Sequence, residues 1–150
     1  LLKQAADRLQ LTNIKQVVTD AFRYGPVAPA YDRVLADVPC SGWGVFGRKA
    51  DLRWQANKNI EELVKLQEKA LDYAANFVRA GGILVYSTCT LNPAENEEQI
   101  KKFLQRNPKF TLVNAKEILP SDFVVEGMFK TLPFKHDMDG AFAAKMRKAR

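Results

Sequence analysis

The sequence has few of the side chains that bind transition metals, and it has no long apolar run. It contains two cysteines, Cys40 and Cys89, and one histidine, His136. The cysteines are far apart and form no CxxC pair, so the ligands of a structural zinc site are missing and we expect no metal. No apolar stretch is long enough to cross a bilayer, so we expect no membrane-spanning helix. Each cysteine is then either a buried apolar side chain or a reactive thiol.

Two signals of other protein classes are weak or missing. One GxGxxG occurs, GWGVFG at 42–47, but no predicted helix starts there, and the cysteine pair would have no role in a dinucleotide-dependent oxidoreductase with a similar sheet, so we disfavour that class. No basic segment followed by an apolar one opens the chain, as it would in a secretory leader, so we expect a cytoplasmic protein with reduced cysteines. The chain begins without a methionine, in a pattern typical of a helix already under way, and we therefore expect a fragment or an excised domain.

Length and charge limit the remaining possibilities. A chain of 150 residues with 47% hydrophobic residues is long enough for one well-packed domain, which we expect to span residues 1–150. The net charge is +6, from 23 Lys and Arg against 17 Asp and Glu, which permits an anionic partner such as nucleic acid. Much of the excess lies in GRKADLRW and near the C-terminus, where solvated charge is the alternative explanation.

Hydrophobic periodicity predicts strands that alternate with helices. A long amphipathic pattern predicts a helix over 59–79, ended by a left-handed cap at Gly81, and a second helix follows Pro93. Residues 115–139 carry turn signals and are predicted to be loops. The alternation implies an α/β fold with a parallel sheet, whose ligands bind beyond the carboxyl ends of the strands. The predicted strands are 14–20, 33–38, 83–87, 109–114 and 140–148, after an opening helix over 1–11.

Four polar or reactive side chains directly follow predicted strands, namely Asp20, Asp37, Cys40 and Cys89. Because the carboxyl ends of parallel strands meet at one edge of a sheet, we expect these side chains to gather there. Taken alone, each cysteine has a structural alternative. The Pro-Cys motif would be a tight turn around a buried thiol, and the threonines beside Cys89 would satisfy backbone groups at the strand end. Two such motifs after two strands of one sheet favour a functional pair.

Two stretches, ADVPCSGWGVFGRKADLRW and GGILVYSTCTLNPAENEEQI, resemble the Sun (Fmu) type of RNA cytosine-C5 methyltransferases. The resemblance extends from about Asp20 to the tail LPFKHDMDGAFAAKMRK, in which Ala141 replaces a phenylalanine that is usual in the family. It implies a class I (Rossmann-like) methyltransferase sheet, mostly parallel with an antiparallel strand near the end, and S-adenosyl-L-methionine (AdoMet) as the methyl donor. The family's glycine-rich cofactor loop has no counterpart here. We therefore expect the C-terminal portion of a catalytic domain that lacks its first two strands.

The resemblance also implies roles for individual residues. Cys89 matches the nucleophile that attacks the pyrimidine ring, and Cys40 matches the cysteine that helps to release the product. Asp37 and Pro39 match positions at the cofactor and target-base site, and Asp20 matches the aspartate that contacts the adenosine part of AdoMet. The residue types suit this chemistry, because adding a thiolate at carbon 6 of cytosine makes carbon 5 nucleophilic. Which group then removes the carbon-5 proton is left open.

The charged loop after Cys40 is a candidate RNA contact. We expect Arg48, Lys49 and Arg53 to hold phosphates and Trp54 to stack on a base. The alternative is that the charges are solvated and Trp54 packs in the core. The motif set favours ribosomal RNA of the small subunit (16S) as the substrate, with transfer RNA as the other possibility.

The expected truncation has consequences for the chain by itself. An inactive RNA- or protein-binding fragment is the alternative function, since part of the cofactor site would be missing. Without the first two strands, the apolar side chains of 14–20 and of the opening helix would be exposed. We therefore expect either self-association or a disordered N-terminus, and no tight AdoMet binding.

Overall fold

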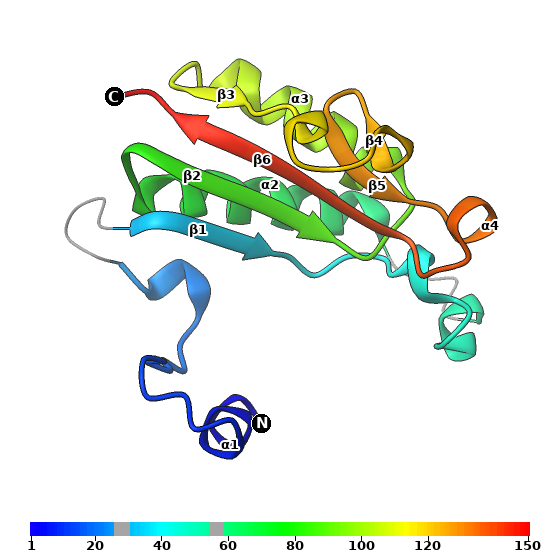
Figure 1. Ribbon diagram of the computed structural model, residues 1–150, viewed down its shortest axis with the longest axis horizontal. Coiled ribbons are helices and arrows are strands. Elements are labelled where there is room, and N and C mark those ends of the chain that lie inside the picture. Colours follow the sequence, from blue (N-terminus) through cyan, green and yellow to red (C-terminus); the bar gives the residue numbers. More distant parts are fainter. Residues whose placement is uncertain (26–30, 55–58) are drawn as a thin grey trace.

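Six strands form one mixed sheet, and helices pack against it (Figure 1). The structure, a computed structural model, describes residues 1–25, 31–54 and 59–150, apart from the side chains of Ala21 and Arg53. The strands are β1 (Tyr31–Asp37), β2 (Val78–Thr88), β3 (Phe110–Leu112), β4 (Val124–Val125), β5 (Met128–Thr131) and β6 (Ala141–Lys148). The helices are α1 (Leu2–Arg8), α2 (Ile60–Phe77), α3 (Glu97–Arg106) and α4 (Pro133–His136), with the 3-10 turns η1 (Ala21–Arg23), η2 (Trp43–Val45), η3 (Ala50–Arg53), η4 (Pro93–Glu95), η5 (Ala115–Glu117) and η6 (Ser121–Phe123).

The strand order is β1-β2-β6-β5-β4, and β3 pairs with β6 beyond the end of β5. Strands β1 and β2 are parallel, whereas β6 is antiparallel to β2, β3 and β5. Strands β1, β2, β3 and β5 therefore run in one direction, and β6 lies among them in the opposite direction, as does the two-residue edge strand β4. This arrangement confirms the expected class I sheet, with its antiparallel strand near the end of the chain.

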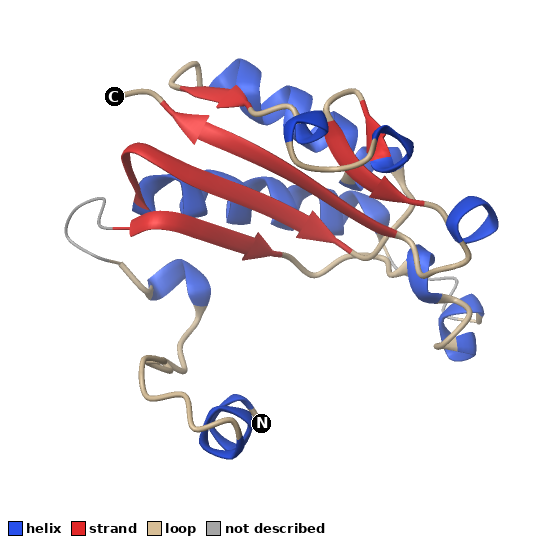
Figure 2. Ribbon diagram, viewed as in Figure 1, coloured by secondary structure: helices blue, strands red, loops and turns tan. Residues whose placement is uncertain are grey.

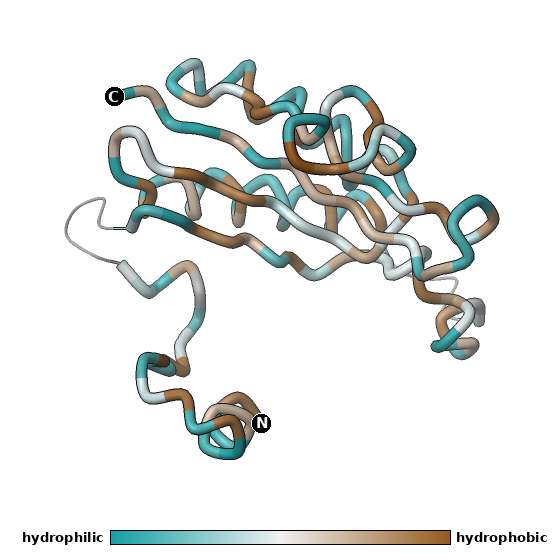
Figure 3. Tube along the Cα trace, in the orientation of Figure 1, coloured by the Kyte–Doolittle hydropathy of each residue, from teal (hydrophilic) through white to brown (hydrophobic). Residues whose placement is uncertain are grey.

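Helices α2 and α3 cover one face of the sheet (Figure 2). Side chains of β2 alternate between the two faces, so Leu84 and Tyr86 are fully buried beneath the helices while Val85 on the other face is half-buried. In Figure 3, hydrophobic stretches run along parts of β1 and β2. Within the described segments, no helix has the length and apolar character needed to cross a bilayer.

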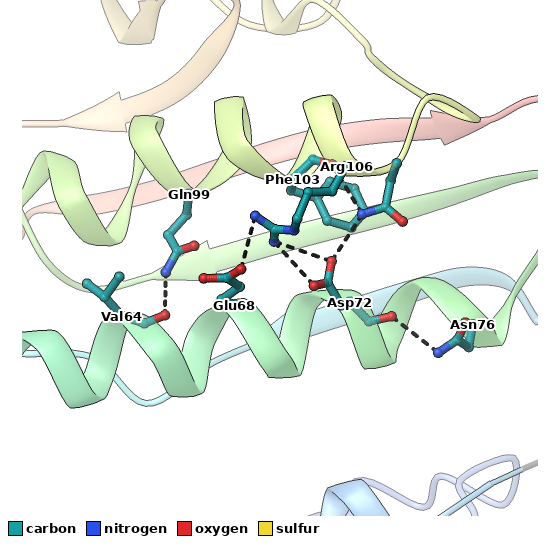
Figure 4. Close-up of polar contacts among 8 residues, drawn as sticks. Val64, Glu68, Asp72, Asn76, Gln99, Phe103 and Arg106 are labelled. Carbon is teal, nitrogen blue, oxygen red and sulfur yellow. Dashed lines mark hydrogen bonds and ion pairs between the residues drawn. The ribbon is translucent and has the colours of Figure 1, made fainter.

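Polar side chains join α2 to α3 (Figure 4). The Arg106 guanidinium lies 3.1 Å from the Glu68 carboxylate and 3.2 Å from that of Asp72. One turn from the start of α3, Gln99 Nε2 donates to the Val64 carbonyl at 2.6 Å. Because α3 begins directly after the loop that follows β2, these contacts fix the far end of that loop against α2.

The segment 14–20 is not a strand, so this prediction was wrong. None of the described residues forms a ladder with it, and its apolar side chains are exposed, Val18 at 90%. A strand persists only where a neighbour accepts and donates its backbone hydrogen bonds, and this segment has no such neighbour here. The expected exposure of its apolar side chains is confirmed, and in α1 Leu2 is exposed while Ala6 is buried. Self-association remains a prediction.

The glycines after α2 have a different role from the predicted helix cap. The helix ends at Phe77, and β2 begins at once with Val78. Tyr31 pairs with Val78 while Arg33 pairs with Ile83, so β2 carries extra residues between the two pairs. Gly81 lies within this irregularity and has a φ of +75°. Glycine accommodates such a left-handed backbone without strain, so it suits this position.

The region 115–139 is more ordered than the turn signals predicted. Strands β4 and β5 form a hairpin whose two loop residues, Glu126 and Gly127, both have positive φ, of 50° and 80°. Two positive φ values in a two-residue loop are typical of a type I′ turn, which matches the twist of paired strands. In the sequence, the Glu-Gly pair flanked by apolar residues in VVEGMF is a pattern that is compatible with such a hairpin.

Candidate active site

The loops that follow β1 and β2 bring the two cysteines together. The parallel strands end side by side, with Asp37 opposite Ser87. Cys40 Sγ lies 3.3 Å from Cys89 Sγ, and the Cys89 backbone N–H points to Cys40 Sγ at 3.4 Å. Both cysteines are free; Cys40 is half-buried and Cys89 is exposed. Cys89 is therefore the more exposed of the two adjacent cysteines.

The two thiols differ in their surroundings. Burial raises the pKa of the Cys40 thiol to about 11, and the hydrogen bond and charge interaction with the Cys89 side chain add to the increase. Cys40 therefore stays protonated at neutral pH, in which form it is a poor nucleophile but able to donate a proton. The exposed Cys89 is consequently the better placed of the two to attack a substrate.

A third loop closes the site from the end of α4. The Gly44 N–H donates to the Cys89 carbonyl at 3.0 Å, and the Gly140 N–H donates to the Gly44 carbonyl at 2.8 Å. A Cβ at Gly44 would lie 2.2 Å from the Gly140 carbonyl oxygen and 2.8 Å from that of Cys89. Only glycine allows this approach, so the residue at position 44 decides whether the three loops can meet.

A groove of about 820 Å³ runs along the free edge of β1. Residues of β1, α2 and the segment before η1 line it, and Asp37, Val38 and Pro39 lie among its lining residues, next to Cys40. The Ser87 hydroxyl donates to the Asp37 carboxylate at 2.8 Å, which orients this acid at the end of the strand. The groove has the size of many small-molecule sites, which span roughly 300–1,000 Å³.

Asp20 does not lie at this edge, so its predicted position was wrong. Its carboxylate accepts the Phe22 N–H at 3.0 Å, in a turn that packs on the C-terminal part of α2 (Figure 1). There Phe22 contacts Tyr73 edge-on, and Tyr24 stacks on Phe77. This part of α2 leads into the start of β2, at the opposite end of the sheet from the thiols. The expectation depended on a strand over 14–20, which does not form, and the role of Asp20 toward the cofactor remains a prediction.

Three of the predicted RNA-contacting residues, Arg48, Lys49 and Trp54, lie on the surface. Trp54 is 87% exposed, so the alternative of a core tryptophan is wrong. Arg48 forms an ion pair with Asp139, and Lys49 is exposed. The side chain of Arg53 lies outside the described part of the structure.

Sequence analysis missed several residues around the site. Two further aromatic side chains are exposed near it, Trp43 at 41% and Phe134 at 83%. Three buried polar residues, Gln67, Glu95 and Asn96, lie beneath the cysteine loops. Glu95 is one of several acidic residues that follow Pro93 in the sequence, and no local pattern signals a buried polar side chain. In the described part of the chain, no cluster of three or more His, Cys, Asp or Glu side chains could hold a metal ion.

Solved structures share this fold over almost the whole chain. The crystal structure of PH0851 superimposes with a TM-score of 0.89 at 34% identity, covering 98% of this chain and 34% of that one. The crystal structure of NSun6 from Pyrococcus horikoshii with SFG gives a TM-score of 0.83 at 30% identity, covering 99% of this chain and 38% of that one.

The curated sequence relatives are described as ribosomal RNA methyltransferases. A probable ribosomal RNA small subunit methyltransferase B from Synechocystis sp. is 45% identical over 148 residues, which cover 95% of this chain and 33% of the relative. A protein of the same description from Bacillus subtilis is 39% identical, over 99% of this chain and 35% of its own length. The chain thus spans about a third of the length of these curated relatives. Residues 1–147 match the family described as 16S rRNA methyltransferase RsmB/F, and the chain belongs to this family.

Proposed function

We propose that this chain holds the target base in an AdoMet-dependent RNA cytosine-C5 methyltransferase that acts on 16S ribosomal RNA in the cytoplasm. The observation that carries the proposal is the contact between Cys40 Sγ and Cys89 Sγ, 3.3 Å apart beyond the carboxyl ends of two parallel strands. Family membership supports the RNA substrate and the methyl donor. The paired thiols support carbon 5 of cytosine as the atom that is methylated.

The reaction begins at Cys89. Its thiolate forms a bond to carbon 6 of the cytosine, and the displaced electron pair makes carbon 5 nucleophilic. When bound, AdoMet supplies an electrophilic methyl group, which carbon 5 takes up. A base then removes the carbon-5 proton, the ring double bond re-forms, and the bond between carbon 6 and Cys89 Sγ breaks. The target nucleotide must leave its stack to reach Cys89, at a cost of a few kcal/mol.

Cys40 is placed to assist the last step. Its Sγ touches the sulfur that must leave, and its pKa of about 11 keeps it protonated at neutral pH. A neighbouring S–H that donates to the departing Cys89 sulfur stabilises the negative charge that develops on it. We assign Cys40 to product release for this reason. Asp37 ends β1 just before the loop that carries Cys40, and its carboxylate is assigned to the target base and the cofactor.

The groove beside β1 fits part of the cofactor. Its lining includes Asp37, Val38 and Pro39 and otherwise consists largely of apolar and aromatic side chains, which suits a ligand with a flat ring and a charged end. We propose that Asp37 and Pro39 border AdoMet close to the thiols. Thr19, the neighbour of Asp20, lines the groove, whereas Asp20 itself does not. A contact between Asp20 and the adenosine part requires that the turn at 20–24 moves.

Methyl transfer tests the function directly. In a fusion, residues 1–150 replace the matching third of the Synechocystis relative, and the product is incubated with AdoMet and unmodified 16S RNA. We expect 5-methylcytosine at one position of the RNA, detected by mass spectrometry of the digested nucleosides. If only transfer RNA is methylated, the proposed substrate would change from 16S ribosomal RNA to transfer RNA. A folded fusion that methylates neither RNA would contradict the proposal and favour a binding module without turnover.

RNA binding tests the surface around η3. Replacing both Arg48 and Lys49 by alanine removes two exposed cations near Trp54 and the thiols. We expect weaker binding of a 16S fragment, by about tenfold at low salt, and a log–log salt slope that is less steep by about 1 to 2. Fluorescence anisotropy at several salt concentrations measures both quantities.

A matched variant controls for net charge. Lys65 and Lys69 are exposed on α2, and replacing both by alanine removes the same charge from a different surface. This variant should keep nearly the original affinity and slope. If both double variants bind equally well, the loop after Cys40 is not part of the RNA interface.

A further inference from the structure

Two consecutive polar residues, Glu95 and Asn96, are completely buried beneath the thiol pair. Glu95 is the last residue of η4 and Asn96 directly precedes α3, at the end of the loop that follows β2. Among the described residues, no Lys, Arg or His forms an ion pair with Glu95; its carboxylate accepts hydrogen bonds from amide groups. A buried carboxylate and a buried amide are stable only if neighbouring groups satisfy them, so the partners of these two side chains are informative.

Glu95 and Gln67 hold both neighbours of Cys40. The Ser41 N–H donates to Glu95 Oε2 at 2.8 Å, immediately after Cys40 in the chain. Immediately before it, the Pro39 carbonyl accepts from Gln67 Nε2 at 2.9 Å. The Gln67 amide also lies 3.4 Å from Glu95 Oε2, so the two anchors contact each other. The backbone of Cys40 is therefore fixed on both sides.

Asn96 holds both neighbours of Cys89 in the same manner. Thr88 Oγ1 donates to Asn96 Oδ1 at 2.6 Å, and Asn96 Nδ2 donates to the Thr90 carbonyl at 2.9 Å. The Thr90 hydroxyl lies 2.6 Å from the Ser41 hydroxyl, which links the two cysteine loops directly. Moving either loop would leave buried donors or acceptors without partners, which opposes the motion.

We infer that Glu95 and Asn96 are positioning residues for the thiol pair. Glu95, together with Gln67, fixes the loop of Cys40, and Asn96 fixes the loop of Cys89. Because the two residues are adjacent in the chain, they share one rigid support, and the sulfur atoms stay in contact. The purpose of this arrangement rests on the proposed function, in which Cys40 acts on the sulfur of Cys89.

The equilibrium between thiols and disulfide measures the positioning without RNA or AdoMet. In glutathione buffers, the two protein thiols and one oxidised glutathione give a Cys40–Cys89 disulfide and two reduced glutathiones. The equilibrium constant yields the effective concentration of one thiol at the other. In the chain of residues 1–150, we expect Glu95→Ala and Asn96→Ala to lower this value at least about tenfold, since small displacements of reacting groups have large effects. Glu95→Gln keeps an oxygen that accepts the Ser41 N–H and should stay close to the original value.

Gln99→Ala is the matched control. Gln99 is also fully buried and donates to the Val64 carbonyl on α2, and its side chain has no hydrogen bond to a described residue of either cysteine loop. This variant should lower the melting temperature and leave the effective concentration unchanged. A folded Glu95→Ala or Asn96→Ala chain with the original effective concentration, or a Gln99→Ala chain with an equal loss, would overturn the inference.

Near-isosteric variants decide the question if the alanine variants do not fold. Asn96→Asp removes the donor to the Thr90 carbonyl and should lower the effective concentration, whereas Glu95→Gln should not. Equal values for both variants would overturn the inference. This test is independent of the test of catalysis. A fusion that transfers no methyl group would contradict the proposed function but not the positioning of the thiols. An unaltered thiol equilibrium in the variants would contradict the positioning role but not methyl transfer.

Discussion

Replacing Cys89 by alanine in the fusion with the Synechocystis relative should lower methyl transfer by at least about 10⁴-fold. Carbon 5 of cytosine becomes nucleophilic only when a thiolate adds at carbon 6. The second thiol cannot readily replace it, since Cys40 is half-buried and its pKa of about 11 keeps it protonated. The rate of 5-methylcytosine formation under single-turnover conditions measures the loss.

A covalent trap separates loss of the nucleophile from loss of binding. RNA with 5-fluorocytosine at the target position cannot release its carbon-5 substituent as a proton, so the bond to the enzyme should persist. The original fusion should show a shifted band on a denaturing gel, and the Cys89→Ala variant should show none while it still binds RNA. A shifted band in the alanine variant would mean that another residue attacks the base.

The elements whose residues carry a complete local pattern were predictable from the sequence. Strands β2 and β6 alternate between buried and less buried side chains, and α2 has a long amphipathic stripe, so burial on the sheet agrees with local preference. Strand β1 carries a similar apolar run and pairs as predicted, although most of its side chains are exposed. The segment 14–20 has an equally good β-branched pattern, yet it forms no strand. Its pattern specifies which side chains would be buried but supplies no neighbour, and pairing is a property of the whole sheet.

The residues of the candidate site show the same difference between what local patterns predict and what depends on contacts across the fold. Cys40 and Cys89 could be placed together because each follows a strand that forms, and parallel strands end at the same edge. Asp20 could not, because its place depended on the strand that does not form. Glu95 and Asn96 were not found, since their burial depends on contacts with α2 and with both cysteine loops. Sequence reasoning located the reactive groups and missed the groups that hold them.

The opposite phenotype is expected for Cys40→Ala in the same fusion. Attack by Cys89 does not need the Cys40 thiol, so the covalent bond to RNA should form. Release should slow, because the departing Cys89 sulfur loses the protonated thiol that lies 3.3 Å away. Enzyme should therefore accumulate on unmodified RNA as a shifted band on a denaturing gel, and turnover after the first methylated product should fall at least about 100-fold, within the range for one proton-transfer group.

The double variant shows whether the trapped band has the expected origin. Replacing both Cys40 and Cys89 by alanine should remove the band, because the covalent bond requires the Cys89 sulfur. Val45→Ala, a truncation of a buried apolar residue in the same loop, controls for loosened packing and should not accumulate the adduct. Normal turnover of Cys40→Ala without a band would mean that Cys40 only fills space beside the nucleophile. Accumulation that depends on Cys89 and is absent from Val45→Ala places Cys40 in the release step, where its protonated state at neutral pH is the property that matters.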